Sequence, residues 1–138
     1  MSTENLVIHT DGASRGNPGR AACGVVIADE KGEILSRLSR YIGIATNNQA
    51  EYQAVIAALE EALRLGARRV SLYADSELVV RQLNGRYRVK NESLKPLYLR
   101  VKELAARLQG FTVTHVMRDQ NTLADGLANQ SFRDAGSP

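Results

Sequence analysis

The first third of the chain alternates short apolar runs with polar turns. Residues 6–11 and 21–28 are predominantly apolar and predict two strands, and a third strand is expected near residues 33–39. The connector from Gly12 to Gly19 is rich in glycine, serine and asparagine, which favours a turn with several free backbone amides. Sequential strands joined by short connections predict an antiparallel meander.

After residue 49 the apolar positions recur at helical spacing. This pattern predicts a helix over residues 49–65, with Asn48 as its N-cap and Gly66 as its stop. A strand is then expected at 70–74, helices at 76–83 and 94–108, a strand at 111–117, and a last helix at 121–132 capped by Asn121.

This order of elements predicts an α/β fold with a five-stranded mixed sheet, three antiparallel strands plus two parallel strands, flanked by helices. The first strand is expected to pair in parallel with the fourth, and the fourth with the fifth, through right-handed crossovers.

Length and composition indicate the class of protein. We expect 138 residues to form a single domain, 1–138, and 43% hydrophobic with 24% charged residues is typical of a soluble globular protein. The polar N-terminus resembles no secretory signal, and no apolar run reaches the roughly 18 residues of a membrane span. The single cysteine, Cys23, lies in an apolar run, so we expect a buried thiol and a cytoplasmic location.

Four carboxylates interrupt the apolar pattern at element boundaries. Asp11 ends the first run, Asp75 ends the fourth strand, and Asp125 lies one turn into the last helix. Glu51 opens the long helix on its core-facing stripe; a contribution to the helix dipole explains its position but not its facing. Because a buried carboxylate is costly unless a cation compensates it, convergence of these acids predicts a divalent metal, magnesium or manganese, and hydrolytic chemistry.

Positive charge is distributed unevenly along the chain. The net charge is +3, but residues 76–118 hold nine lysines and arginines against three glutamates. Such a run is compatible with an ordinary solvated surface. It is equally compatible with a basic flank that holds phosphates beside an acidic metal site.

Four ordered motifs connect these features to a known family. They are Thr10–Gly19, Thr46–Tyr52, Tyr73–Ser76 and Asn121–Ala128. Over residues 5–131 the chain resembles ribonuclease H of type 1, which cleaves the RNA strand of RNA–DNA hybrids. The resemblance implies the ribonuclease H-like fold and an endoribonuclease activity.

The resemblance also assigns roles to the acids. The family's metal-site carboxylates fall on Asp11, Glu51, Asp75 and Asp125. The implied reaction uses two Mg²⁺ ions roughly 4 Å apart, with Mn²⁺ as a substitute. Asp11 would bridge both ions with Asp75 as co-ligand, Glu51 would also contact the ribose 2′-hydroxyl, and Asp125 would be the more mobile outer ligand.

Substrate contacts carried over from the family lie in two loops. Backbone groups of Gly12 and Ser14, with the Asn17 side chain, would read 2′-hydroxyls, while Thr46, Asn47 and Ser76 would contact phosphates. Turn chemistry alone is the alternative role for Asn17 and Asn47. A smaller phosphate contact is expected from Arg86, Arg88 and Lys90 around Tyr87.

Two departures from the family pattern stand out. The segment from Asn84 to Ser93 is too short for the basic protrusion of many bacterial members, so the chain resembles the compact subgroup without it. The loop from residue 116 to 121 contains no histidine, and Arg118 is the candidate for an auxiliary role. His115 and His9 are interpreted as strand residues and not as ligands.

Alternatives remain open at this point. Another nuclease of the same fold, or a non-catalytic nucleic-acid-binding module, would share parts of this pattern. The expected partner is an RNA–DNA hybrid, with double-stranded RNA open. We expect a monomer without membrane association.

Overall fold

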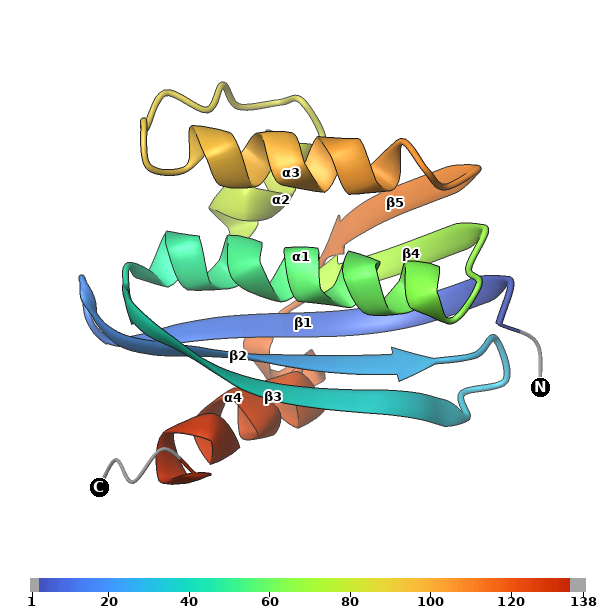
Figure 1. Cartoon of the computed structure of the whole chain (residues 1–138), viewed down its shortest axis with the longest axis horizontal. Coiled ribbons are helices and arrows are strands. Elements are labelled where there is room, and N and C mark those ends of the chain that lie inside the picture. Colours follow the sequence, from blue (N-terminus) through green and yellow to red (C-terminus); the bar gives the residue numbers. More distant parts are fainter. Residues whose placement is uncertain (1–2, 135–138) are drawn as a thin grey trace.

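The computed structural model describes residues 3–134 and confirms the mixed sheet (Figure 1). The sheet order is β3-β2-β1-β4-β5. The strands are β1 (Asn5–Gly16), β2 (Gly19–Ala28), β3 (Ile34–Ala45), β4 (Arg69–Ala74) and β5 (Gly110–His115). The helices are α1 (Asn47–Arg64), α2 (Glu77–Leu83), α3 (Lys95–Ala105) and α4 (Thr122–Asp134), with a short 3-10 turn at Arg118–Gln120.

Strand directions follow the prediction. β1 and β3 both run antiparallel to β2, whereas β4 pairs in parallel with β1 and with β5. Parallel pairing of β1 with β4 puts Thr10 beside Ala74, so the residues that follow them, Asp11 and Asp75, leave neighbouring strands at the same level of the sheet.

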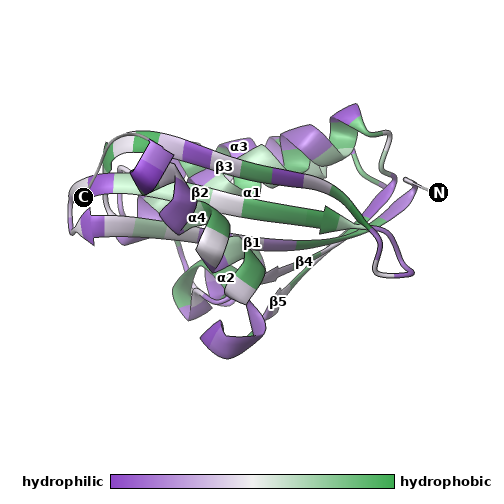
Figure 2. Cartoon of the chain, turned by 90° about the horizontal axis from the view of Figure 1, so that it is seen from below, coloured by the Kyte–Doolittle hydropathy of each residue, from purple (hydrophilic) through white to green (hydrophobic). Residues whose placement is uncertain are grey.

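Helices cover the two faces of the sheet unequally. α1, with α3 and α2 beside it, lies on one face, and α4 lies alone across β1, β2 and β3 on the other (Figures 1 and 2). The main core forms between α1 and the sheet, where Ile8, Tyr52 and Leu72 are fully buried. In Figure 2 the arrowhead end of β1 is polar, whereas apolar residues lie farther back along the sheet.

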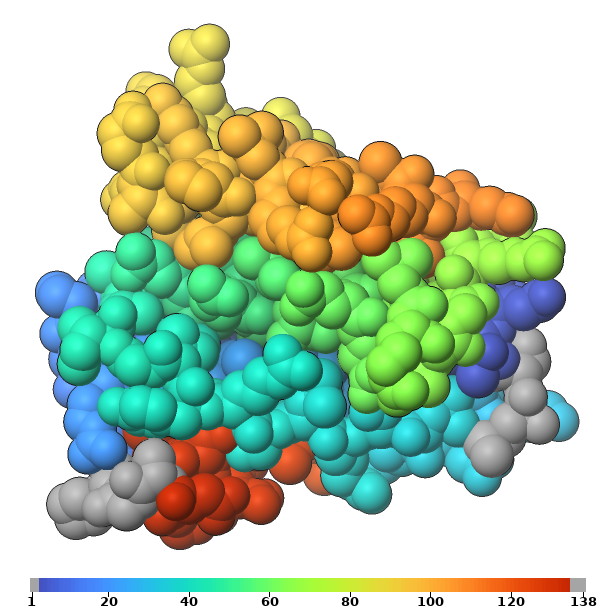
Figure 3. Space-filling view, in the orientation of Figure 1, coloured from blue at the N-terminus to red at the C-terminus, as the bar shows by residue number. Residues whose placement is uncertain are grey.

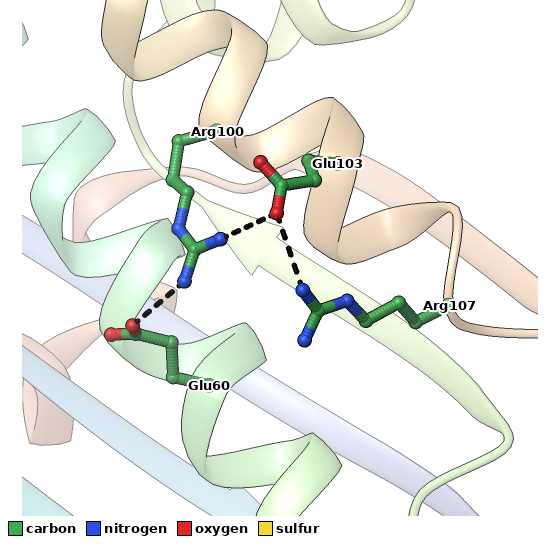
Figure 4. A network of polar contacts seen from close by, with 4 residues as sticks. All are labelled: Glu60, Arg100, Glu103 and Arg107. Atoms are coloured by element: carbon green, nitrogen blue, oxygen red, sulfur yellow. Dashed lines mark hydrogen bonds and ion pairs between the residues drawn. The ribbon is translucent and has the colours of Figure 1, made fainter.

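α3 is attached to α1 by exposed ion pairs and by buried apolar side chains. Arg100 bridges Glu60 of α1 at 3.3 Å and Glu103 at 2.9 Å, and Arg107 joins Glu103 at 3.2 Å (Figure 4). These side chains are all at least 38% exposed, and exposed ion pairs contribute about 0–1 kcal/mol each. The buried Val101 and Leu104 therefore supply most of the attachment.

The first hairpin corrects the predicted strand ends. β1 continues five residues beyond Asp11 to Gly16, and the ladder with β2 runs to Gly16 opposite Gly19. The expected turn over residues 12–19 is therefore only the two-residue connection Asn17–Pro18. The sequence did not predict this part of the strand because glycine and serine have low strand propensity. Cross-strand pairing with β2 overrides that preference. β3 lengthens correspondingly, to Ala45.

Helix ends also differ from expectation. The N-cap of α1 is Thr46 and not Asn48: the Thr46 hydroxyl accepts a hydrogen bond from the Gln49 amide at 3.1 Å, and the Gln49 side chain accepts one from the Thr46 amide at 2.8 Å. This reciprocal capping box satisfies two amides that a lone asparagine cap could not. α3 ends at Ala105, three residues early, while Pro96 lies in its first turn as predicted.

The segment between α2 and α3 contains no additional helix, as expected from its length. It projects from the body of the molecule as the yellow segment of Figure 3. None of the helices between residues 3 and 134 combines the length and apolar character needed to cross a bilayer.

Two glycines allow helices to approach the central strands very closely. A Cβ atom on Gly12 would lie 2.3 Å from the backbone carbon of Ala50 in α1. One on Gly24 would lie 2.1 Å from the carbonyl oxygen of Ala124 in α4. Gly24 is paired directly with Asp11, and paired residues share a face of the sheet. The close approach of α4 therefore depends on a missing side chain opposite Asp11.

We predict that Gly24→Ala lowers the free energy of unfolding by roughly 1–3 kcal/mol, because the added methyl overpacks the contact with α4. The matched control is Gly126→Ala, in α4 itself, where an added Cβ meets nothing within 4 Å. That change should be neutral or stabilise by up to about 1 kcal/mol through helix propensity. Urea denaturation in chelator measures both, and equal effects of the two substitutions would contradict the packing argument.

Candidate metal centre and active site

Carboxylates from three different elements meet at one point. Oxygen atoms of Asp11 on β1, Glu51 on α1 and Asp75 after β4 all lie within 4.8 Å of one another. Asp125, in the first turn of α4, lines the same cleft. The sequence prediction that these four acids converge is thus matched by the geometry.

The cleft has a volume of about 400 Å³ and is mostly polar. Arg118, the proposed auxiliary residue, belongs to its lining, as do the predicted substrate-contact residues Gly12, Ser14, Asn47 and Ser76. The full lining is Asp11, Gly12, Ala13, Ser14, Asn47, Asn48, Glu51, Asp75, Ser76, Arg118 and Asp125. Thr46 and Asn17 lie outside it.

Burial without compensating charge perturbs the acids. Asp11 is 5% exposed, and burial, the charge of Asp75 and contact with Asp125 raise its pKa to about 7. Glu51 is 6% exposed, and burial with the charges of Asp11 and Asp75 raises its pKa well above the ordinary value, although a hydrogen bond from the Gly12 amide opposes this. Perturbed acids gathered in a cleft are typical of functional sites.

The donor set fits a hard divalent cation. Oxygen Oε2 of Glu51 is buried and has no hydrogen-bond partner among the described residues. Several carboxylate oxygens converging at this spacing are the ligands that Mg²⁺ and Mn²⁺ prefer. A bound cation would supply the positive charge that compensates the buried carboxylates of Glu51 and Asp11.

Asn121 is a site residue whose role sequence reasoning missed. Its position before α4 is the predicted one, but its side-chain oxygen Oδ1 accepts no bond from the described helix amides, so the expected side-chain cap is not formed. Its Nδ2 instead donates to the carbonyl of Thr10 at 2.8 Å and to Oδ2 of Asp75 at 3.0 Å. The sequence signal was an asparagine four residues before Asp125, which by itself also fits an ordinary cap.

Hydrogen bonds tie the hairpin tip to the start of α1. The Asn47 side chain accepts a bond from the Ser14 amide at 2.9 Å, and the Asn17 side chain accepts one from the Asn47 amide at 3.1 Å. The Ser14 hydroxyl donates to the carbonyl of Ala45 at 2.8 Å. These side-chain oxygens stabilise the fold. The side-chain NH₂ groups of Asn17 and Asn47 remain suited to donate to an acceptor such as a 2′-hydroxyl or a phosphate.

Ser76 and Thr46 are both helix caps. The Ser76 hydroxyl accepts a bond from the Val79 amide at 3.4 Å at the start of α2, as the Thr46 hydroxyl does for α1. Each hydroxyl keeps its hydrogen as a donor, so the predicted phosphate contacts of these residues remain predictions.

The basic segment forms a groove separate from the acidic cleft. Arg86 and Arg88 line a groove of about 610 Å³ together with Tyr87, Tyr98 and Lys95, whereas Lys90 is exposed outside the lining. Elsewhere in the basic run, Arg81, Lys95, Arg100 and Arg107 are paired with glutamates. Among the described residues, Arg86, Arg88 and Lys90 form no ion pair. The solvated-surface interpretation therefore holds for part of the run, and unpaired positive charge is concentrated in this segment.

The histidines and the cysteine lie outside the acidic cleft. His115 is the exposed last residue of β5, and His9 stacks on Tyr73 with ring centroids 5.2 Å apart. Burial lowers the pKa of His9 and raises that of Cys23 to about 11, so the imidazole is kept neutral and the thiol protonated. The predictions that both histidines are strand residues and that the thiol is buried are confirmed, although only His9 is packed and His115 is exposed.

Comparison with known proteins matches this geometry to a family. A family model described as "Reverse transcriptase-like" matches residues 9–131. Ribonuclease HI of Halobacterium salinarum is 46% identical over 91% of this chain. A crystal structure of ribonuclease H1 from that organism superposes with a TM-score of 0.92 at 43% identity, covering 94% of this chain and 98% of the other. The chain belongs to the ribonuclease H type 1 family.

A second similar structure contains nucleic acid. The crystal structure of LC11 ribonuclease H1 in complex with an RNA/DNA hybrid superposes with a TM-score of 0.91 at 42% identity, covering 96% of this chain and 99% of that chain. A bifunctional protein of Mycobacterium tuberculosis is 42% identical over 92% of this chain. The chain spans 35% of the length of that protein and 63% of the Halobacterium ribonuclease HI.

We predict that the stability of the protein in chelator falls as pH rises from 5 to 8. The folded state keeps a proton on Asp11 up to about pH 7, whereas the unfolded chain releases it near the ordinary value of 3.8. The folded state therefore binds more protons in this window, and the free energy of unfolding should drop by roughly 1–4 kcal/mol across it.

The substitution Asp11→Asn removes this titration, so its stability should vary less with pH and exceed that of the parent at pH 8 in chelator. Asp119→Asn makes the same change of charge at an exposed residue of the 3-10 turn and serves as the control. Urea unfolding between pH 5 and 8 measures all three proteins. A parent protein whose stability rises over this range would contradict the assignment.

Proposed function

We propose that the chain is an endoribonuclease that hydrolyses the RNA strand of RNA–DNA hybrids at the acidic cleft. The observation that carries this proposal is the meeting of Asp11, Glu51 and Asp75 within 4.8 Å beside Asp125. The hybrid complex of the LC11 relative, at 42% identity, supports the substrate class. The same four acids, all from one chain, support action as a monomer.

Metal dependence is part of the proposal. Asp11, Glu51 and Asp75 would hold Mg²⁺ or Mn²⁺, with Asp125 as a further ligand from α4. Two such ions, when bound, would lower the pKa of the attacking water and stabilise the leaving 3′ oxygen. Because metal ligands must be deprotonated, the raised pKa values of Asp11 and Glu51 make binding weaker at acid pH.

The residues of the chain itself supply positioning and selectivity. Asp11 and Asp75 hold their places because parallel strands carry them. Asn47 and the backbone near Gly12 line the cleft beside Glu51, where a 2′-hydroxyl would be read. Asn17 lies outside the cleft but adjoins it through its hydrogen bond with the Asn47 backbone amide. Arg118, also in the lining, offers its guanidinium to a phosphate oxygen.

Location in a reducing cytoplasm completes the proposal. It rests on Cys23, whose thiol is buried and has a raised pKa, so nothing in its surroundings favours oxidation.

A cleavage assay tests the activity and its substrate. With magnesium or manganese, the protein should cut the RNA strand of a hybrid; a hybrid with one deoxynucleotide at the preferred position should be cut elsewhere, because the 2′-hydroxyl contact is lost. All-DNA duplex should resist, and chelator or Asp11→Asn should abolish cleavage. Double-stranded RNA is included to measure the breadth of the activity. Efficient cutting of DNA duplex would favour a broader nuclease, and hybrid binding without any cleavage a non-catalytic module.

The basic groove makes a separate prediction about binding. Each phosphate contact contributes close to one unit to the log–log salt dependence of binding. Replacing Arg86, Arg88 and Lys90 with alanine should therefore raise KM for hybrid several-fold, flatten the salt dependence and leave kcat nearly unchanged.

A matched triple variant controls for the loss of three charges. Lys31, Arg64 and Arg68 lie at the opposite end of the sheet, around the start of β1, and are exposed. Their replacement should leave the salt slope near that of the parent. If both triple variants behave alike, the segment between α2 and α3 only connects two helices.

A further inference from the structure

Asn121 links three of the four carboxylate positions through one residue. It is 1% exposed, and its Nδ2 reaches both the carbonyl that precedes Asp11 and the carboxylate of Asp75. Its own carbonyl accepts the bond from the Asp125 amide at 3.1 Å. β1, the end of β4 and the first turn of α4 are thus joined at a single buried residue, the first two through its side chain and the third through its backbone carbonyl.

The orientation of this amide follows from its partners. Both groups near the terminal nitrogen, the carbonyl of Thr10 and Oδ2 of Asp75, are acceptors, so the NH₂ group must point toward them. Oδ1 consequently points elsewhere and is buried without a partner among the described residues. Leaving a buried acceptor unsatisfied costs stability, and an asparagine before a helix would ordinarily use that oxygen to cap it.

Asp75 has reason to need such a partner. It lies between β4 and α2, and the negative charge that it shares with Asp11 and Glu51 pushes the three acids apart. The Asn121 amide is the side-chain donor that contacts it among the described residues. A donor held by α4 and β1 therefore fixes the Asp75 carboxylate against this repulsion.

From this geometry we propose that Asn121 is a positioning residue for the metal centre, which holds the Asp75 carboxylate in the orientation that binds the cation. The proposal rests on the proposed function only in that the acidic cleft binds divalent metal. Hydrogen-bonding partners of metal-ligating groups typically change metal affinity or activity by about 10–100-fold when they are removed.

Calorimetric titration of Mn²⁺ into the substrate-free protein tests the proposal. Asn121→Ala should weaken Mn²⁺ binding by about tenfold and raise the Mg²⁺ concentration for half-maximal cleavage by a similar factor, with kcat largely restored at saturating metal. Asp75→Asn should weaken binding as well. Adding Asn121→Ala to Asp75→Asn should then cost less than Asn121→Ala costs alone, because the amide acts through that carboxylate.

Ser39→Ala provides the matched structural control. The Ser39 hydroxyl lies 2.6 Å from the carbonyl of Leu127 and 2.6 Å from the Ser131 hydroxyl, so it fastens α4 to β3 without contacting a carboxylate. This variant should unfold more easily in urea yet bind Mn²⁺ as the parent does. If Asn121→Ala does not fold, Asn121→Ser is measured in its place, and the same weakening is expected.

The outcomes separate the two proposals. Loss of stability with unchanged Mn²⁺ affinity in the Asn121 variant, while Asp75→Asn binds weakly, would overturn the positioning role and leave the metal centre intact. Unchanged Mn²⁺ affinity in Asp75→Asn would overturn the metal centre and the positioning role together.

Discussion

Repulsion among buried carboxylates is the constraint on which the rest of this structure depends. Asp11 and Glu51 are almost fully buried and close to Asp75, so in the absence of a cation their ionised forms are disfavoured. The protein accepts this cost beside a core that is otherwise largely apolar. Local destabilisation of this kind is common at functional sites, since a ligand that relieves it binds selectively to the folded state.

The surrounding fold is arranged so that these acids cannot move apart. Gly12 lets the first turn of α1 lie against β1, which brings Glu51 to Asp11, and Gly24 lets α4 lie against β2, which brings Asp125 to the same cleft. The capping box at Thr46 fixes where α1 begins, and bonds from Asn17 and Asn47 fasten that start to the hairpin. Sheet, helices and hairpin therefore act as one support for charges that repel.

Hydrophobic periodicity predicted the five strands and the helices α1 to α4, because each of these elements buries an apolar face and that face leaves a periodic pattern in the sequence. The sequence predicted the ends of these strands and helices less well. The extension of β1 past Asp11 comes from cross-strand pairing with β2, which the low strand propensity of Gly12–Gly16 opposes. The cap of α1 is Thr46 and not Asn48 because Thr46 and Gln49 form a reciprocal pair of hydrogen bonds, which residue preference at a single position does not reveal. The four acids were predicted because charge at a buried boundary is conspicuous, whereas Asn121 resembles many ordinary caps.

Asn121 also shows how one position can serve two levels of organisation. Its backbone begins α4, which any residue could do, while its side chain leaves the helix amides and crosses to β1 and Asp75. An aspartate would cap a helix at least as well but would add a further negative charge beside Asp75, and a serine would be too short to span both acceptors. The asparagine amide is neutral and carries two N–H donors, so it contacts Asp75 and the Thr10 carbonyl without adding negative charge to the site. The chemistry of the cleft, more than the stability of the helix, thus accounts for the residue found there.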